Sequence, residues 1–281
     1  MSCPYRFGIY EKAMAPKDLP QLFVQAAKAG FQTFEISLDE TDERLDRLNW
    51  PDEKLKIIRD AANQEGVQLF SACLSGHRKY ALGSADPNTV RQAMEIMNKA
   101  IEFACKLGIR VLQITGSDVF YEPHSPDTEK RYIANLALGV EYAAQYGVML
   151  AIEPVEDYIT SIHKAMDIVN RIQSPWLQVY PDVANLAAMG FDPITELGYC
   201  TQHIVGLHIR DAQAGTSYNI PWGSGIVDFI AVFRKLSQMH FTAPIIIEFW
   251  HEDGFDDFQR IYASKAFLLD RFEKTLQIQE N

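Results

Sequence analysis

The stretch TEKRYIANLALGVEYAAQYGVMLAIEP, residues 128–154, decides the fold class, because it contains one complete repeat of the pattern along the chain. Its first part, Thr128–Tyr146, has apolar residues at helical spacing, and Gly147 follows directly, as is typical of a residue that ends a helix. The apolar run Met149–Glu153 then has the length and composition of a buried strand. A helix, a glycine and an apolar strand in this order predict a unit of a parallel α/β fold.

The same unit recurs along the chain. Three further stretches have helical spacing and end shortly before a glycine: Leu19–Ala29, Asp52–Gln64 and Pro87–Leu107. Besides Met149–Glu153 the strand candidates are Arg6–Tyr10, Thr33–Ser37, Gln68–Cys73, Val111–Thr115, Gln178–Asp182, Ile204–His208 and Ile245–Glu248. A last amphipathic helix is predicted at Asp257–Gln277. Eight βα units in about 250 residues are the usual size of a closed (β/α)8 barrel, the TIM barrel.

The main alternative is an open doubly wound sheet, which normally has a glycine-rich turn after its first strand. Here Glu11-Lys12-Ala13 follows the first strand candidate, and the chain contains no GxGxxG motif. No Pro- or Ser-rich linker divides the 281 residues. We therefore predict a single TIM-barrel catalytic domain over residues 1–281.

The composition narrows the classes of partner. Hydrophobic residues make up 47% of the chain and charged residues 22%, which predicts a folded protein with a large core. The net charge of −11, without any basic run, argues against a nucleic-acid partner, because phosphate backbones repel an acidic surface. No apolar run is long enough to cross a bilayer and no leader precedes the first strand, so we expect no membrane partner and a cytoplasmic location. The four cysteines form no CxxC pair, and we expect reduced thiols.

Polar side chains stand at the C-terminal ends of four consecutive strand candidates: Glu153, Asp182, His208 and Glu248. A barrel gathers these strand ends on the face that carries the active site in this fold. Three carboxylates at one point need a counter-charge, and three oxygen donors with one imidazole suit Mn²⁺, Zn²⁺, Co²⁺ or Mg²⁺. The alternative is that each acid only caps a loop or a helix. Because all four end apolar runs and buried charges need partners, a metal site is the better interpretation.

Several segments resemble the L-ribulose-5-phosphate 3-epimerases, also described as L-xylulose-5-phosphate 3-epimerases of L-ascorbate and pentose catabolism. These segments are Gly8-Ile9-Tyr10-Glu11-Lys12-Ala13, Ser37-Leu38-Asp39-Glu40-Thr41-Asp42, Leu74-Ser75-Gly76-His77-Arg78, Tyr180-Pro181-Asp182-Val183-Ala184-Asn185-Leu186, His208-Ile209-Arg210-Asp211 and Gly223-Ser224-Gly225-Ile226-Val227-Asp228-Phe229. The resemblance runs from about Gly8 to about Glu252. The wider superfamily of xylose-isomerase-like barrels shares only the four metal-site residues, so the Leu-Ser-x-His-Arg and Glu-Thr-Asp pieces are the more specific evidence.

The resemblance implies one divalent metal ion bound by Glu153, Asp182, His208 and Glu248, with Glu153 and Glu248 also acting as the acid/base pair. Epimerisation at C3 of a ketose removes a proton from one face and returns it to the other, which requires two carboxylates and an electrophile for the enediolate. The implied substrate is a small phosphorylated ketopentose. Asn185 agrees with this, because related epimerases of unphosphorylated ketohexoses have a histidine three residues after the metal-binding aspartate.

Further polar residues on the same face are predicted to bind the substrate, and they are Glu35, His77, Arg78, Lys164, Asn185 and Arg210. Arg78 and Lys164 are the candidate ligands of the phosphate, and Lys164 lies at a helix start, where anions bind favourably. The alternatives are an ion pair at the barrel rim for Glu35 and a solvated or ion-paired side chain for the others. Gly223-Ser224-Gly225 could hold phosphate through backbone N–H groups, or could be a flexible loop.

Three other functions fit the same residues. Aldose–ketose isomerisation, as in hydroxypyruvate or xylose isomerases, also passes through an enediolate and differs in the carbon that receives the proton. A metal-dependent phosphodiesterase, such as the barrel repair endonucleases, needs several metals and a DNA-binding face, which the charge of −11 opposes. A non-catalytic sugar sensor would not require both glutamates. The residues leave the oligomeric state open, and a homodimer is the expectation.

Overall fold

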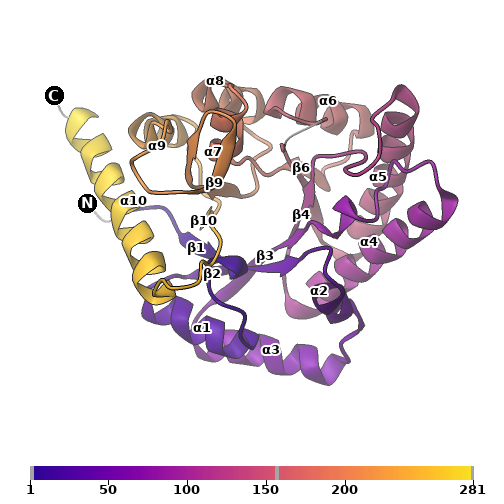
Figure 1. Ribbon diagram of the computed structural model, residues 1–281, viewed down its shortest axis with the longest axis horizontal. Helices are drawn as coiled ribbons and strands as arrows, with labels where there is room; N and C mark the ends of the chain where they lie inside the picture. The colour runs from indigo at the N-terminus through magenta and orange to yellow at the C-terminus, as the bar shows by residue number, and fades with distance from the viewer. Residues whose placement is uncertain (1–2, 156–157, 280–281) are drawn as a thin grey trace.

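The computed structural model describes residues 3–155 and 158–279, and most of its strands form one curled parallel sheet (Figure 1). Within these ranges the strands of this sheet are β1 (Phe7–Tyr10), β2 (Thr33–Leu38), β3 (Gln68–Leu74), β4 (Val111–Thr115), β5 (Met149–Glu153), β6 (Leu177–Val179), β7 (Leu207–Ile209) and β10 (Ile245–Ile247). Their order is β6-β5-β4-β3-β2-β1-β10-β7. The two ends of the sheet meet, because Val179 pairs with Ile204 and Asp182 pairs with His208 in parallel bridges. The predicted TIM barrel is therefore confirmed, and it closes along what we call the β6–β7 seam.

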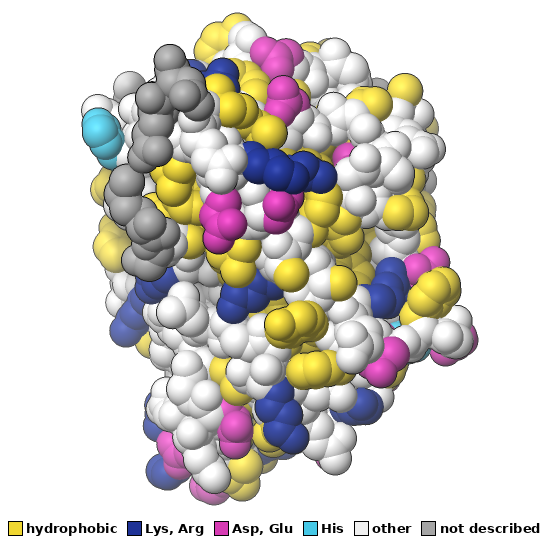
Figure 2. All heavy atoms as spheres, turned by 90° about the vertical axis from the view of Figure 1, so that its left-hand side faces the viewer, with side chains coloured by type: hydrophobic (Ala, Val, Ile, Leu, Met, Phe, Trp, Pro, Cys, Tyr) yellow, Lys and Arg dark blue, Asp and Glu magenta, His cyan; other side chains and the backbone are white. Residues whose placement is uncertain are grey.

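Helices surround the sheet on its outside (Figure 1). They are α1 (Leu19–Lys28), α2 (Asp42–Asp46), α3 (Asp52–Gln64), α4 (Pro87–Leu107), α5 (Pro126–Tyr146), α6 (Ile162–Ile172), α7 (Val183–Ala188), α8 (Pro193–Leu197), α9 (Phe229–Gln238) and α10 (Asp257–Gln279). Helix α10 packs against α9 along one side of the barrel. On that side acidic, basic and apolar side chains are interspersed (Figure 2), so this face presents no field of one charge. Among the described helices we find none with the length and apolar character needed to span a bilayer.

Local sequence signals explain where the helices begin and end. Helices α3 and α4 have the predicted bounds, and α4 ends at Gly108, whose φ of 79° lies in the left-handed region that favours glycine. Helix α5 begins at Pro126, two residues earlier than predicted, because the Ser125 side chain accepts a hydrogen bond from the Thr128 N–H. Proline is well tolerated in this first turn, where its missing N–H costs no helical hydrogen bond.

The two strands at the seam are displaced from their predicted positions. The prediction Gln178–Asp182 ran too far, since β6 ends at Val179 and Pro181 has no N–H to donate to a ladder. The prediction Ile204–His208 began too early, because Ile204 contributes only an isolated bridge and β7 begins at Leu207. An antiparallel hairpin of β8 (Asp211–Gln213) and β9 (Thr216–Ile220) follows β7, and the sequence analysis did not predict it.

The barrel interior has its own apolar cluster, separate from the main core between sheet and helices. Its buried members are Tyr10, Cys73, Val111, Ala151, Tyr180 and Ile246. Successive side chains of a strand point to opposite faces, so Ala151 faces the same way as Glu153 and Ile246 the same way as Glu248. This apolar layer therefore lies directly beneath the polar side chains at the strand ends.

Candidate active site

Four buried side chains meet at the C-terminal end of the barrel. Glu153 ends β5, Asp182 follows β6, His208 lies in β7 and Glu248 follows β10. Each is at most 6% exposed. Each also offers one ligand atom, and these four atoms lie within 4.8 Å of one another. The structure therefore brings together the four residues, called the quartet below, that the sequence pointed to.

Two cationic groups face the three carboxylates of the quartet. Arg210 donates through Nε and Nη2 to Asp182 Oδ2, at 2.9 and 2.6 Å. The same Nη2 lies 3.1 Å from Glu248 Oε2. His208 Nδ1 lies 2.9 Å from Glu153 Oε1 and 3.5 Å from Glu248 Oε2. Burial alone would lower the pKa of His208, but the surrounding glutamates raise it well above its usual value.

Burial disfavours the charged form of both glutamates in the quartet. It raises the pKa of Glu153, against the opposing effect of the nearby His208. It also raises the pKa of Glu248 to about 7, against the opposing effects of Arg210 and His208. A carboxyl group with a pKa near 7 can both accept and donate a proton at neutral pH, which is the property that general acid–base catalysis requires.

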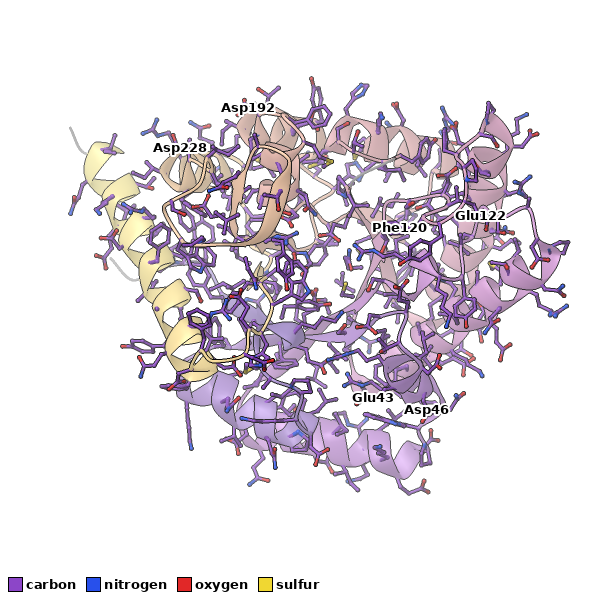
Figure 3. All side chains as sticks on the ribbon, in the orientation of Figure 1. Glu43, Asp46, Phe120, Glu122, Asp192 and Asp228 are labelled. Carbon is purple, nitrogen blue, oxygen red and sulfur yellow. The ribbon has the colours of Figure 1, made fainter. Side chains whose placement is uncertain are left out.

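Asp182 has a structural role as well. Its Oδ1 accepts hydrogen bonds from the N–H groups of Ala184 and Asn185, at 2.7 and 3.2 Å, and thereby caps α7. The capping alternative thus applies to one oxygen of Asp182, while Oδ2 belongs to the ion pair described above. Asp192 and Asp228 cap α8 and α9 in the outer ring of the molecule (Figure 3).

The donor atoms of the quartet fit a divalent cation. Atoms that surround one ion at the usual distances of about 2.0–2.6 Å are at most about 5 Å apart. The observed limit of 4.8 Å agrees with such an arrangement. Glu248 Oε2 is buried, and within the described chain it makes no hydrogen bond, although Arg210 is near. A buried carboxylate oxygen without a donor is costly, and an ion would remove that cost.

Gln113 is a site residue that the sequence analysis missed. Its Nε2 donates a hydrogen bond to Glu153 Oε2, so Glu153 is held from the side opposite His208. Gln113 Oε1 is buried and has no hydrogen-bond partner among the described residues. The available signal was a polar residue within the apolar run Val111–Thr115, on the same strand face as Val111, which belongs to the interior cluster.

A cavity of about 610 Å³ opens above the quartet. Its wall contains charged and polar side chains from several strand ends, namely Arg78, Glu153, Asn185, Arg210 and Glu248. The β8–β9 hairpin forms another part of the wall, where Tyr218 stacks on Trp250 with ring centroids 5.1 Å apart. The Arg210 guanidinium lies over the Trp250 ring, 4.7 Å from its centroid. The volume is within the range of small-molecule sites.

Arg78 reaches this cavity from the 3-10 turn after β3 (Gly76–Arg78). Its guanidinium lies over the ring of Phe120, 5.0 Å from the centroid, and Phe120 belongs to the loop after β4 (Figure 3). The Nε atom of Arg78 is buried without a hydrogen-bond partner in the described chain. Arg78 therefore brings a guanidinium group to the cavity wall, and such a group binds anionic groups of ligands well.

Three of the predicted substrate ligands lie outside the wall of this cavity. His77 is buried, its Nε2 lies 3.1 Å from the carbonyl oxygen of Ala93, and burial lowers its pKa to about 4. Lys164 is exposed and donates to oxygen atoms of its own loop. Glu35 is fully buried in β2. Direct substrate contact by these three residues stays a prediction.

The glycine loop at 223–225 already binds a carboxylate of this chain. Asp211 Oδ2 accepts hydrogen bonds from the N–H groups of Gly223 and Gly225, at 2.8 and 3.0 Å. Asp211 Oδ1 accepts a further one from Val227 at 3.3 Å. These N–H groups are therefore used, and the interpretation of this loop as a phosphate site is corrected.

Comparisons with known proteins agree with the architecture. Residues 23–271 match the family model described as xylose isomerase-like TIM barrel. The L-ribulose-5-phosphate 3-epimerase UlaE of Escherichia coli K12 is 40% identical over 270 residues, 95% of each chain. The protein of the same name from Escherichia fergusonii is 39% identical with the same coverage. A solved L-ribulose 3-epimerase has a TM-score of 0.79 at 20% identity, covering 98% of this chain and 97% of that chain. The 3-keto-D-glucoside 4-epimerase YcjR from E. coli has a TM-score of 0.77 at 19% identity, covering 95% and 99%. At these identities the two structures support the fold alone.

Proposed function

This chain belongs to the xylose isomerase-like TIM-barrel family and, within it, to the L-ribulose-5-phosphate 3-epimerases, and from this premise we propose that it interconverts L-ribulose 5-phosphate and L-xylulose 5-phosphate. The observation that carries the proposal is the pair of buried glutamates, Glu153 and Glu248, in the wall of one cavity. They come from β5 and from the end of β10, which β6 and β7 separate around the barrel. Two carboxylates that approach a ketose from different strands suit a reaction that inverts one carbon.

The two glutamates divide the proton transfer between them. One carboxylate removes the C3 proton of one epimer, and the other carboxyl group returns a proton to the opposite face of the enediolate. In the reverse direction the two groups exchange roles. Gln113 donates a hydrogen bond to Glu153 Oε2, which restricts the direction of this carboxylate.

The quartet provides the electrophile that this reaction needs. When a divalent ion is bound by Glu153, Asp182, His208 and Glu248, it supplies a Lewis acid that polarises the C2 carbonyl and stabilises charge on the substrate oxygens. Mn²⁺, Zn²⁺, Co²⁺ and Mg²⁺ all suit these donors. Arg210 adds a fixed positive charge beside Asp182 and Glu248, and it therefore also favours an anionic substrate.

The cavity supports a phosphorylated ketopentose rather than a free sugar. Arg78 brings a cation with an unused donor to the wall, in a chain whose net charge is −11. Asn185 lies in the same wall, where its Oδ1 accepts a hydrogen bond from Arg210 Nη2 at 2.9 Å and its Nδ2 donates a long one to the Pro154 carbonyl oxygen at 3.5 Å. We propose that Arg78, Asn185 and Arg210 contact the substrate.

The proposed reaction is tested by the position at which deuterium from the solvent enters the product. The metal-loaded protein is incubated with L-ribulose 5-phosphate in D₂O, and NMR locates the deuterium and identifies the products. A 3-epimerase places deuterium at C3 and forms L-xylulose 5-phosphate. Deuterium at C1 or C2 with an aldose product would instead identify an aldose–ketose isomerase, and recovery of unlabelled substrate alone would contradict both.

A further inference from the structure

A buried chain of polar side chains lies beneath His208, and the proposed proton transfer does not use it. Glu35 in β2 is fully buried, and its Oε1 lies 2.7 Å from His208 Nε2. Glu35 Oε2 accepts a hydrogen bond from Ser71 Oγ at 2.6 Å. The Ser71 hydroxyl in turn lies 3.3 Å from the hydroxyl of Tyr180. Glu35 and Ser71 are paired residues of β2 and β3, and Tyr180 directly follows β6.

The direction of these hydrogen bonds follows from the number of protons. Ser71 has one hydroxyl proton, which it donates to Glu35, so Tyr180 must be the donor in its contact with Ser71. Glu35 then receives protons from two sides, from Ser71 and from His208. Among the described residues no Lys or Arg side chain forms an ion pair with Glu35. The second donor to its carboxylate is therefore His208. A buried carboxylate in this position requires a proton on Nε2 of the imidazole.

The other ring nitrogen faces the opposite direction. His208 Nδ1 lies 2.9 Å from Glu153 Oε1 and 3.5 Å from Glu248 Oε2, among the carboxylates of the quartet. The Tyr180 ring meets the imidazole edge to face, with centroids 4.8 Å apart, and restricts its rotation. The imidazole is therefore held at one nitrogen and presented at the other.

We infer that Glu35 is a positioning residue that fixes His208 as the Nε2–H tautomer and thereby makes Nδ1 the nitrogen that binds the divalent ion. The inference rests on the metal site of the proposed function and assigns the ligand atom within it. A carboxylate that accepts the distal N–H of a ligand histidine orients the ring and makes the proximal nitrogen a stronger donor. Both oxygens of Glu35 have partners within the protein and none of its surface is exposed, which agrees with a positioning role.

The experiment compares Glu35→Gln with Glu196→Gln. Glu196 is a matched control, because it is also a buried glutamate that accepts hydrogen bonds, but its donors are the N–H groups of Ile162 and His163 at the start of α6. Binding of Mn²⁺ alone is measured by calorimetry. Glu35→Gln is expected to weaken Mn²⁺ binding about 10- to 100-fold, the usual effect of removing such a partner. Glu196→Gln is expected to leave it unchanged.

A second measurement detects the proton on Nε2 of the His208 ring. The hydrogen-bonded Nε2 proton of His208, identified by its absence in His208→Gln, is expected far downfield in the NMR spectrum of the wild type, with or without Zn²⁺. In Glu35→Gln this resonance should move upfield or disappear. Unchanged Mn²⁺ affinity in Glu35→Gln, or an unchanged Nε2 proton, would overturn the inference. If the wild type bound no divalent ion at all, the proposed function would fail, and the inference would fail with it as a statement about a metal ligand.

Discussion

Replacing either glutamate of the proposed acid/base pair by glutamine should abolish most of the epimerase activity while leaving the site able to bind metal. Glu153→Gln and Glu248→Gln keep the size of the side chain and one carbonyl oxygen, but an amide can neither take up nor release the C3 proton. A placed acid/base group contributes at least about 10²-fold in rate, which is about 2.7 kcal/mol in the barrier. We therefore expect a loss of at least about 10²-fold in each variant.

The two variants should differ in metal affinity, because the hydrogen bonds of the two glutamates differ. Glu153 Oε2 accepts a hydrogen bond from the amide of Gln113, and Glu153 Oε1 lies 2.9 Å from His208 Nδ1. An amide nitrogen in place of Oε2 would face the Gln113 donor, so Glu153→Gln must also rearrange this neighbour. Glu248 Oε2 has no hydrogen-bond partner in the described chain. We expect metal binding to weaken more in Glu153→Gln than in Glu248→Gln.

The assay follows proton exchange and epimerisation separately, starting from each epimer in D₂O. A variant that lacks one base should still exchange the C3 proton of the epimer that faces the remaining base, and should form little of the other epimer. A single base returns the proton to the face from which it was taken, so exchange without inversion is the expected sign. Near wild-type epimerisation by either variant, with metal bound, would refute the two-base mechanism.

The remaining predictions concern the metal, the phosphate and a buried histidine. Metal analysis should find one divalent ion per chain. The ion should be lost in Asp182→Asn but kept in Asp192→Asn, which makes the same change at a comparable helix cap in the outer ring; equal metal content in the two variants would count against the quartet. Arg78→Ala should raise KM for a phosphorylated ketose far more than for its unphosphorylated analogue. Lys164→Ala should have a smaller effect, because the Lys164 side chain already donates to its own loop. Equal changes in KM with both substrates would show that Arg78 does not bind the phosphate. His77 has a pKa of about 4 in the folded protein and about 6.5 in the unfolded chain. Between these pH values the unfolded chain binds more protons, so the free energy of unfolding must fall as pH falls, by about 3 kcal/mol in total. Urea unfolding between pH 4 and 7 should show this slope in the wild type and a shallower one in His77→Gln, and parallel slopes would contradict it.

The sequence was sufficient for the fold and for the convergence of the quartet. Val111–Thr115 and Met149–Glu153 were predicted with the observed bounds, because apolar runs between a helix-ending glycine and a polar residue leave little choice. Asp182 and His208 were placed at the site although their strands were misplaced by several residues. This succeeded because a parallel barrel collects its strand ends on one face, whatever the length of each ladder.

The contacts of the site could not be predicted, because they join residues far apart in the sequence. The N–H groups that bind the Asp211 carboxylate lie in a loop twelve or more residues later in the sequence. The sequence therefore did not indicate that this loop binds Asp211. The His77 ring contacts the Ala93 carbonyl oxygen in α4, which the position of His77 after a strand does not indicate. Its contact with the substrate stays a prediction. Side-chain direction in a short turn depends on what packs against it, and neither spacing nor residue type encodes that.

The β6–β7 seam is the junction at which the described strands share the fewest paired residues. Across it the described chain has isolated bridges, whereas β2 and β3 share a ladder of six residue pairs from Thr33 to Leu38. Asp182 and His208 form one of the bridges at the seam and are also two of the four predicted metal ligands. An ion bound by both Asp182 and His208 would connect the two ends of the sheet, which are β6 and β7. The cofactor would then stabilise the junction of β6 and β7 as well as activate the substrate, because a ligand that binds only the folded state stabilises it.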